Sequence, residues 1–243
     1  MISLLICIAL LSYLLGNVNW ALVISKIKKS DIRKLGSGNP GTLNMSRNFG
    51  LKVGILTFLL DVLKGAVPTL VAYFVFKGKI FEVSKFLVSD FAIYLCGLCA
   101  VLGHIYPVFL KFKGGKGIAS TIGVFLVCES VHGWGWACVS IMAIVAALAF
   151  IYFTEFGAMG SFIAITPPAI SGCIRLFLNF TASGIVFHFV TNMLIFLICF
   201  FTWFAHRKNI ERMLSGDEHP TSIKEMVVKM KAKKLAEKSK IEQ

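Results

Sequence analysis

Long apolar runs separated by short basic segments constrain the fold of this chain more than any other feature. A transmembrane helix needs about 20 mainly apolar residues, and seven runs reach or approach that length. The chain is 57% hydrophobic over 243 residues, whereas soluble domains have about 45–50% apolar residues. We predict an all-α, polytopic membrane protein with seven transmembrane helices, at residues 2–24, 53–76, 86–103, 118–131, 134–153, 157–174 and 184–205.

The fourth run is the shortest and carries Glu129. As one helix, residues 118–153 would extend about 54 Å, against a hydrocarbon core of about 30 Å. Gly133 and Gly135 offer a natural break in this stretch. We therefore expect two helices here.

Lysine and arginine predict the orientation. With seven spans, the loops after spans one, three and five share a side with the C-terminal segment, and that side holds twenty of the 25 basic residues. The opposite side holds four in its loops, Lys77, Lys79, Lys85 and Arg175, and Lys64 lies within a span. Because cytoplasmic loops are enriched in Lys and Arg, we expect the N-terminus outside and the C-terminus in the cytoplasm. The apolar N-terminal stretch lacks a basic n-region and is predicted to be a retained helix.

We interpret residues 1–243 as a single domain, since no internal repeat is visible. Residues 205–243 are the predicted cytoplasmic tail, in which 222–240 combine a partial apolar stripe with many lysines. A helix on the anionic inner leaflet and a solvated helix would both have this pattern. The formal charge of +13 raises the alternative of nucleic-acid binding. That function needs basic residues on one soluble face, and here they are scattered, so no nucleic-acid partner is expected.

The first basic loop is rich in glycine and short polar side chains, and reads GSGNPGTLNMSR over residues 36–47. Glycines allow backbone N–H groups to converge on one point. Arg47 adds a planar cation that suits phosphate or carboxylate. An anion site and a turn-rich connector both explain this loop. The candidate ligands are Ser37, Gly38, Asn39, Gly41, Thr42, Asn44 and Arg47.

The second basic loop runs from His104 into the fourth span and contains the string FKGGKG, residues 112–117. Glycines directly before a helix expose amides at its positive end, which favours an anion site over a merely basic connector. A Walker A motif requires Gly and Ser or Thr where Leu110 and Gly117 stand, so nucleotide hydrolysis is not supported. The candidate ligands are His104, Lys113, Gly114, Gly115, Lys116 and Gly117.

The third polar cluster, residues 204–218, follows the last span. His206, Asn209 and Arg212 recur every three residues, so they lie on one side of a predicted helix, and Glu218 comes shortly after it. A site residue and an interfacial histidine are equally good interpretations of His206. The cluster nevertheless lies on the same predicted side of the membrane as the two basic loops.

Within the second span, Asp61 and Lys64 lie three residues apart on one helical face. Charges inside a bilayer are costly and usually pair or face a polar cavity. We predict a mutual ion pair that steadies the site, with direct substrate contact as the alternative.

Taken in order, these clusters resemble the bacterial acyl-phosphate:glycerol-3-phosphate acyltransferase family (PlsY type). The resemblance covers about the whole chain, and its motifs are GSGNPGTLN with Arg47, GHIYPVFLKFKGGKG at 103–117, HRKNIERMLSGDE at 206–218 and DVLKG at 61–65. It implies a bacterial inner-membrane enzyme of seven helices, with its active site on the cytoplasmic face. The implied reaction moves a fatty acyl group from acyl phosphate to the 1-hydroxyl of glycerol-3-phosphate, giving lysophosphatidic acid and phosphate. The resemblance also implies no metal, no cofactor, and a functional link to the enzyme that makes acyl phosphate.

Both implied substrates carry phosphate, and the clusters suit two phosphate sites. Gly114, Gly115, Lys116 and Gly117 are expected to hold acyl phosphate and to stabilise its leaving phosphate. The expected ligands of glycerol-3-phosphate are Ser37, Arg47, His206 and Asn209, with Lys116 shared between the sites and all five expected to be catalytic. The resemblance favours the phosphate of glycerol-3-phosphate as the proton acceptor, with His206 or His104 as a general base the alternative.

A transporter of a phosphorylated anion is the alternative of a different class. It too would place basic residues and broken helices at a polar site. Transporters usually carry that site near the membrane midplane, between two related halves. Clusters at one face and the absence of a visible repeat favour the enzyme.

Overall fold

The computed structural model describes residues 1–82, 84–180, 184–218, 220, 221, 223–228 and 232. Within these residues the chain forms helices and no strand, apart from one isolated bridge between Ile80 and Leu87. Most of the predicted amphipathic stretch 222–240 lies outside the described residues.

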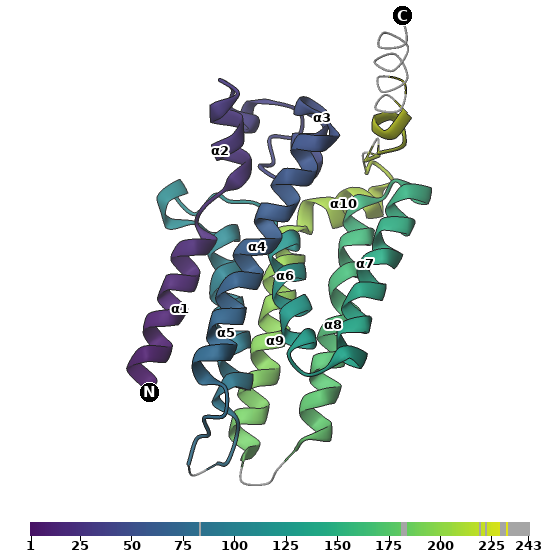
Figure 1. The fold of residues 1–243 in the computed structure, drawn as a ribbon. Helices are drawn as coiled ribbons and strands as arrows, with labels where there is room; N and C mark the ends of the chain where they lie inside the picture. The colour runs from purple at the N-terminus through teal and green to yellow at the C-terminus, as the bar shows by residue number, and fades with distance from the viewer. Residues whose placement is uncertain (83, 181–183, 219, 222, 229–231, 233–243) are drawn as a thin grey trace, which may run out of the picture.

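Seven apolar helices run along the described bundle: α1 (Ile2–Gly16), α4 (Leu51–Phe76), α5 (Val88–Ile105), α6 (Ile118–Ser130), α7 (Trp134–Thr154), α8 (Gly157–Leu178) and α9 (Ile185–Ala205). The shorter elements are α2 (Trp20–Ile27), α3 (Thr42–Phe49), α10 (Arg207–Ser215) and the 3-10 helices η1 (Ile32–Lys34) and η2 (Val108–Leu110). Figure 1 shows α2, α3 and α10 at one end of the bundle and the N-terminus at the other. We call the first the polar end and the second the opposite end.

The helix α6 is short and buried. Six segments of the described chain are long and apolar enough to cross a membrane, with α1 and α2 counted together as Ile2–Ile27. By contrast α6 has 13 residues and extends about 20 Å, less than a hydrocarbon core of about 30 Å. A Cβ on Gly65 would overlap the carbonyl oxygen of Ser120, so the backbones of α4 and α6 touch there. The predicted fourth span is therefore a shortened helix inside the bundle.

The first predicted span, residues 2–24, contains a break. One helix ends at Gly16 and the next begins at Trp20. The side chain of Asn19 caps the second helix, since its Oδ1 accepts a hydrogen bond from the amide of Leu22 at 3.0 Å. The sequence prediction missed this cap because the apolar run continues through it.

Lys64 supports that break from α4. Its Nζ donates to the carbonyl oxygen of Val18 at 2.8 Å and lies 2.9 Å from Asp61 Oδ1. A carbonyl group released by a helix break in a membrane needs a donor from within the protein. His104 Nδ1 lies 3.8 Å from the same carboxylate oxygen. The pair therefore links the break after α1 to the end of α5.

A second group of charged residues is buried towards the opposite end. Arg175, which the sequence suggested as a loop residue, lies within α8 and is 3% exposed. Its Nη2 donates to Tyr94 Oη at 3.0 Å, and its Nη1 lies 3.8 Å from Asp90 Oδ2. Nearby, Ser171 Oγ donates to Glu129 Oε2 at 2.8 Å. We call these five residues the buried polar cluster.

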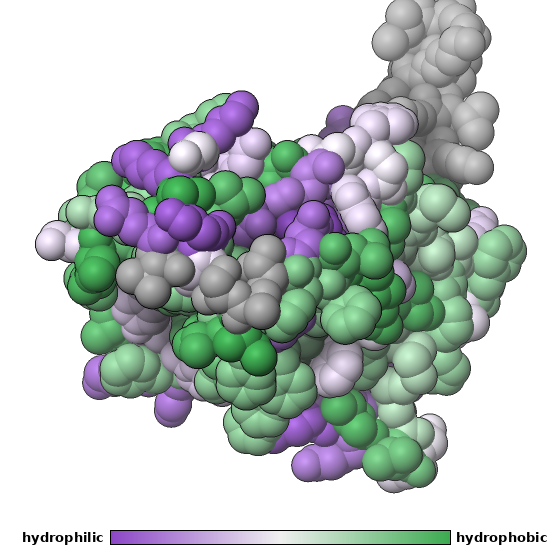
Figure 2. Space-filling model, turned by 90° about the horizontal axis from the view of Figure 1, so that it is seen from below, coloured by the Kyte–Doolittle hydropathy of each residue, from purple (hydrophilic) through white to green (hydrophobic). Residues whose placement is uncertain are grey.

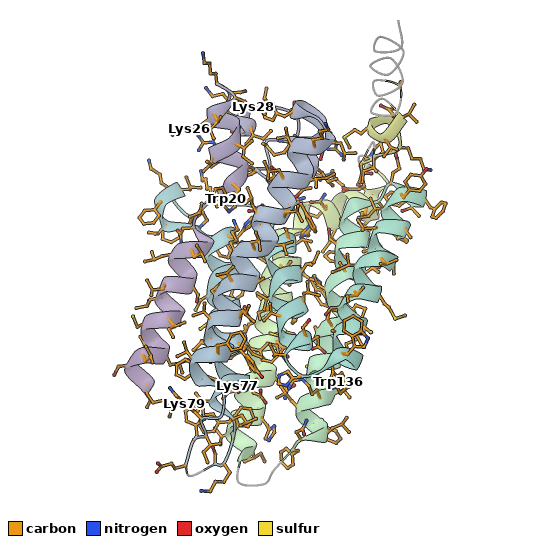
Figure 3. The ribbon with its side chains drawn as sticks, viewed as in Figure 1. Trp20, Lys26, Lys28, Lys77, Lys79 and Trp136 are labelled. Atoms are coloured by element: carbon orange, nitrogen blue, oxygen red, sulfur yellow. The ribbon has the colours of Figure 1, made fainter. Side chains whose placement is uncertain are left out.

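The outer surface between the two ends is apolar, as expected of an integral membrane protein. Exposed large side chains on α1, α4, α7 and α9 are mainly Leu, Ile, Val and Phe. In Figure 3, Trp20, Lys26 and Lys28 lie towards the polar end, and Lys77 and Lys79 lie at the opposite end. Figure 2, which views that opposite end, shows hydrophilic residues among many hydrophobic ones.

Candidate active site

Asn44 of α3 is buried and holds the first basic loop in place. Its Nδ2 donates to the carbonyl oxygens of Leu35 at 3.0 Å and Ile32 at 3.3 Å, and its Oδ1 accepts from the amide of Ser37 at 3.3 Å. Gly36 has a φ of +53°, and a Cβ there would overlap the same Oδ1. Asn44 thus supports the loop from inside, a role that the sequence did not separate from substrate binding.

The remaining predicted residues of this loop line its outer side. Ser37 is exposed, and Gly38, Asn39, Gly41 and Thr42 are half-buried. These residues lead directly into α3, which begins at Thr42. The loop therefore presents short polar groups at the polar end.

Arg47 projects from α3 towards the segment that follows α10. Its Nη2 donates to the carbonyl oxygen of Pro220 at 2.7 Å, and its Nε donates to that of Thr221 at 3.3 Å. The amide of Thr221 in turn donates to the carbonyl oxygen of Glu155 at 3.0 Å. No sequence signal predicted these partners, because backbone carbonyls carry no side-chain pattern.

The glycine loop packs back onto the end of α5. The amide of Gly114 donates to the carbonyl oxygen of Ile105, and that of Gly115 to the carbonyl oxygen of His104, each at 3.1 Å. A Cβ on Gly115 would overlap His104 Nε2. These two amides are engaged within the chain, so the glycines provide close approach between backbone segments. Lys113, exposed, precedes them.

Amides without a helical acceptor lie instead in the first turn of α6. The helix begins after Gly117, whose φ is +86°, and its first intrahelical bond runs from the amide of Thr121 to Gly117 at 2.8 Å. The amides of Ile118, Ala119 and Ser120 precede that bond and have no acceptor in the helix. Together with the helix dipole they make the start of α6, next to Lys116, chemically suited to an anion.

Lys116 joins the glycine loop to α10. Its Nζ donates to Asn209 Oδ1. Asn209 Nδ2 donates to Glu218 Oε1 at 2.7 Å, and Arg212 Nε donates to Glu218 Oε2 at 3.0 Å. Residues from the second and third sequence clusters thus share one hydrogen-bonded network, with the carboxylate of Glu218 at its centre.

Positive charge is in excess around this network. The pKa of Lys116 is lowered from 10.5 to about 8, mainly by burial; Glu218 opposes this shift, and the charges of Arg212 and Arg47 add to it. Three cations therefore lie near one carboxylate. A partly buried site with this imbalance attracts anions.

His206 is a neutral group in this setting. Burial, followed by the charge of Lys116, lowers its pKa from 6.5 to about 4. Its Nδ1 lies 2.9 Å from the carbonyl oxygen of Thr202. Because a carbonyl oxygen only accepts, Nδ1 carries the hydrogen and Nε2 is left as an acceptor. Thr202 was not singled out from the sequence, although its spacing of one helical turn before His206 is a usable signal.

Fold and site together define an integral membrane protein with a basic, partly buried site for anionic groups at one end. A profile of the glycerol-3-phosphate acyltransferase family matches residues 6–216. A glycerol-3-phosphate acyltransferase of Mycoplasmopsis pulmonis is 34% identical over 218 residues, covering 90% of this chain and 92% of that protein. The Aquifex aeolicus protein of the same name is 34% identical over 213 residues, covering 87% and 96%.

Similarity to solved structures points to the same family as these sequence relatives. The crystal structure of PlsY, an integral membrane glycerol 3-phosphate acyltransferase, in its glycerol 3-phosphate form is similar with a TM-score of 0.66 and 32% identity. That similarity covers 89% of this chain and 94% of the other. The lysophosphatidic acid form gives a TM-score of 0.65. This chain therefore belongs to the glycerol-3-phosphate acyltransferase family.

Proposed function

We propose that this chain moves a fatty acyl group from acyl phosphate to the 1-hydroxyl of glycerol 3-phosphate, giving lysophosphatidic acid and phosphate. The observation that carries the proposal is the network of Lys116, Asn209, Arg212 and Glu218, with its excess of positive charge. Crystallised relatives hold glycerol 3-phosphate or lysophosphatidic acid. The distribution of Lys and Arg supports a cytoplasmic site in a bacterial inner membrane, with the N-terminus outside.

In the proposed step, the hydroxyl oxygen of glycerol 3-phosphate attacks the acyl carbon. The bond between that carbon and the bridging phosphate oxygen then breaks, and phosphate leaves with the electron pair. Lys116 and the first amides of α6 stabilise the charge on the leaving phosphate. The donor is already activated, so an acyl-enzyme is unnecessary.

Glycerol 3-phosphate binds on the α3 and α10 side of the site. Arg212 and Arg47 provide cations for its phosphate, and Arg47 exchanges the carbonyl oxygens of Pro220 and Thr221 for phosphate oxygens. Ser37 and Asn209 add hydrogen bonds to the same substrate. These cations also offset the Coulomb repulsion between two phosphate-bearing substrates.

The proposed proton acceptor is the phosphate of glycerol 3-phosphate. A histidine with a pKa of about 4 is a weak base at neutral pH, so His206 orients the hydroxyl through Nε2. His104 is 5% exposed and packs beneath Gly115, which supports a structural role. If His206→Gln abolished the acidic limb of the pH–kcat profile, His206 would be the base instead.

The function is tested with the purified protein in lipid nanodiscs, supplied with a long-chain acyl phosphate and glycerol 3-phosphate. Lysophosphatidic acid and phosphate are expected in equal amounts, and neither is expected when glycerol 3-phosphate is omitted. Acyl-CoA serves as the control donor and is expected to give no product. In sealed vesicles, uptake of glycerol 3-phosphate without phosphate release would instead indicate a transporter.

A further inference from the structure

The loop between α5 and the glycine loop exposes aromatic side chains beside lysines. Phe109 is 74% exposed and Phe112 is 59% exposed, and Lys111 and Lys113 are also exposed. We call residues 107–113 the Phe–Lys loop. The loop thus displays apolar rings and cations side by side, a combination suited to the boundary between acyl chains and headgroups.

The backbone holds these side chains outward. The amide of Phe112 donates to the carbonyl oxygen of Pro107 at 3.0 Å, and the amide of Lys113 donates to that of Leu110 at 3.1 Å. Lys111 and Phe112 have φ values of 54° and 59°, a left-handed conformation that non-glycine residues rarely adopt. Strained conformations of this kind persist where surrounding contacts fix them, often at functional sites. The exposure of the two rings is therefore a fixed feature of the loop.

The loop lies at the edge of the apolar surface. The candidate membrane segment that begins at Val88 extends to Leu110, and Tyr13 Oη in the last turns of α1 donates to the carbonyl oxygen of Tyr106 at 2.8 Å. In Figure 1 the loop projects sideways near the end of α1, below α2. Aromatic rings at this depth contact acyl chains, and adjacent lysines reach the headgroup layer.

The same loop runs directly into the anion site. Gly114 follows Lys113, and the hydrogen bonds of Gly114 and Gly115 to the end of α5 place Lys116 a few residues further along. An anionic amphiphile lying in the bilayer has a charged head and an apolar chain, and the loop offers both exposed lysines and exposed aromatic rings. Charge complementarity and continuity with Lys116 thus point to one occupant.

We propose that the Phe–Lys loop is a docking surface for a single-chain lipid with a phosphate head, which passes from the bilayer to the α6 anion site. This rests on the proposed function in one respect, namely that the lipid is the acyl phosphate donor. Phe109 and Phe112 contact the chain, and Lys111 attracts the head. The loop therefore sets the KM of the donor.

Binding of dodecyl phosphate to the full chain in phosphatidylcholine nanodiscs tests the proposal without turnover. Because two aromatic contacts are lost, Phe109→Ala with Phe112→Ala is expected to weaken dodecyl phosphate about tenfold. Affinity for inorganic phosphate should stay unchanged. In turnover, the same variant should raise the KM of a long-chain acyl phosphate and leave kcat and the KM of glycerol 3-phosphate unaltered.

Matched controls come from the opposite end. Phe177→Ala removes a ring that is 76% exposed on α8, and Lys77→Gln removes a distant lysine for comparison with Lys111→Gln. Neither control is expected to change dodecyl phosphate binding, whereas Lys111→Gln should weaken it about threefold by loss of one charge near the surface.

Three results would overturn the docking surface. The first is wild-type affinity for dodecyl phosphate in the double Phe variant. The second is an equal loss of inorganic phosphate binding, which would mean that the loop only supports the glycine loop. The third is a defect of the double Phe variant that is absent in phosphatidylcholine nanodiscs and appears only when the nanodiscs are repeated with added anionic lipid, which would make the loop a membrane anchor. Binding without any turnover in the wild-type protein would refute the proposed reaction and leave the docking surface standing.

Discussion

The network around Lys116 and the buried polar cluster both place charged residues within or beside the apolar bundle, and they differ in how their charges are balanced. The network around Lys116 has three cations near one carboxylate. In the buried polar cluster one cation, Arg175, interacts with two carboxyl groups, those of Asp90 and Glu129. The first group has positive charge left over for a substrate, whereas the charges of the second act on one another.

Their positions differ as well. The side chain of Arg212 is 38% exposed, and the free amides of α6 point towards the same end. Arg175 is enclosed by α5, α6 and α8, with Tyr94 as its hydrogen-bond partner. The comparison teaches that a charge in a membrane protein indicates function when it is accessible and part of a cationic excess, and stability when it is enclosed by its own partners.

Lys116→Ala should produce the largest effect on catalysis. Loss of the charge that stabilises the leaving phosphate is expected to lower kcat/KM by about 10²–10³-fold. Folding lowers the pKa of this lysine, so its charged form disfavours the folded state at pH 7, and the variant should keep its Tm. Near wild-type activity in the phosphate-release assay would contradict the assigned role.

Arg175→Met should show most clearly that the two groups have different roles, one in stability and the other in catalysis. It leaves the carboxyl groups of Asp90 and Glu129 buried without their cation, which is expected to cost about 3–5 kcal/mol of stability. Activity per folded molecule should change little. Thermal unfolding and turnover measured on the same sample check the expected loss of stability and the expected retention of activity. Adding Asp90→Asn to Arg175→Met should restore part of the Tm. A stable but inactive Arg175→Met protein would show that the cluster serves catalysis.

Alkaline pH should lower the kcat/KM of the wild-type protein for acyl phosphate. Lys116 has a pKa of about 8, so above that pH it loses the charge that is proposed to bind the donor. We expect kcat/KM for acyl phosphate to fall about tenfold per pH unit, as for a single essential proton. In Lys116→Arg the fall should move to higher pH, because guanidinium stays protonated. An unchanged alkaline limb in this variant would assign the limb to another group.

Gly115→Ala should have a smaller effect, limited to the KM of the donor. The new Cβ would overlap the ring of His104, which pushes the glycine loop away from α5 and is expected to raise the KM of the donor about fivefold, the effect of roughly 1 kcal/mol. Gly135→Ala is the matched control, because a Cβ there meets nothing within 4 Å. Equal KM values for the two variants would mean that the packing of this loop does not set the anion site.

Much of this architecture follows from sequence. Apolar runs predicted the helices to within a few residues, except at Asn19, where a side-chain cap interrupts an otherwise apolar stretch. The sequence also predicted that the three polar clusters lie on the same side of the membrane. It did not reveal that Arg175 lies inside the bundle, because its partners Tyr94 and Asp90 are remote in sequence and meet only through helix packing.

The inner details of the site were less accessible from sequence. Glycine before a helix predicted free amides, yet those of Gly114 and Gly115 bind the end of α5. The neutral state of His206 depends on its burial and on the nearby charge of Lys116. Both features are set by tertiary contacts, which residue types and spacing do not specify.

The central claim, acyl transfer with cleavage at the acyl carbon, is tested most directly by isotope labelling. Acyl phosphate carrying ¹⁸O at the bridging position is reacted with glycerol 3-phosphate on the purified protein, and the products are analysed by mass spectrometry. The account predicts that all of the label appears in inorganic phosphate and that the ester of lysophosphatidic acid is unlabelled. Label in the fatty acid, or phosphate released without lysophosphatidic acid, would contradict it.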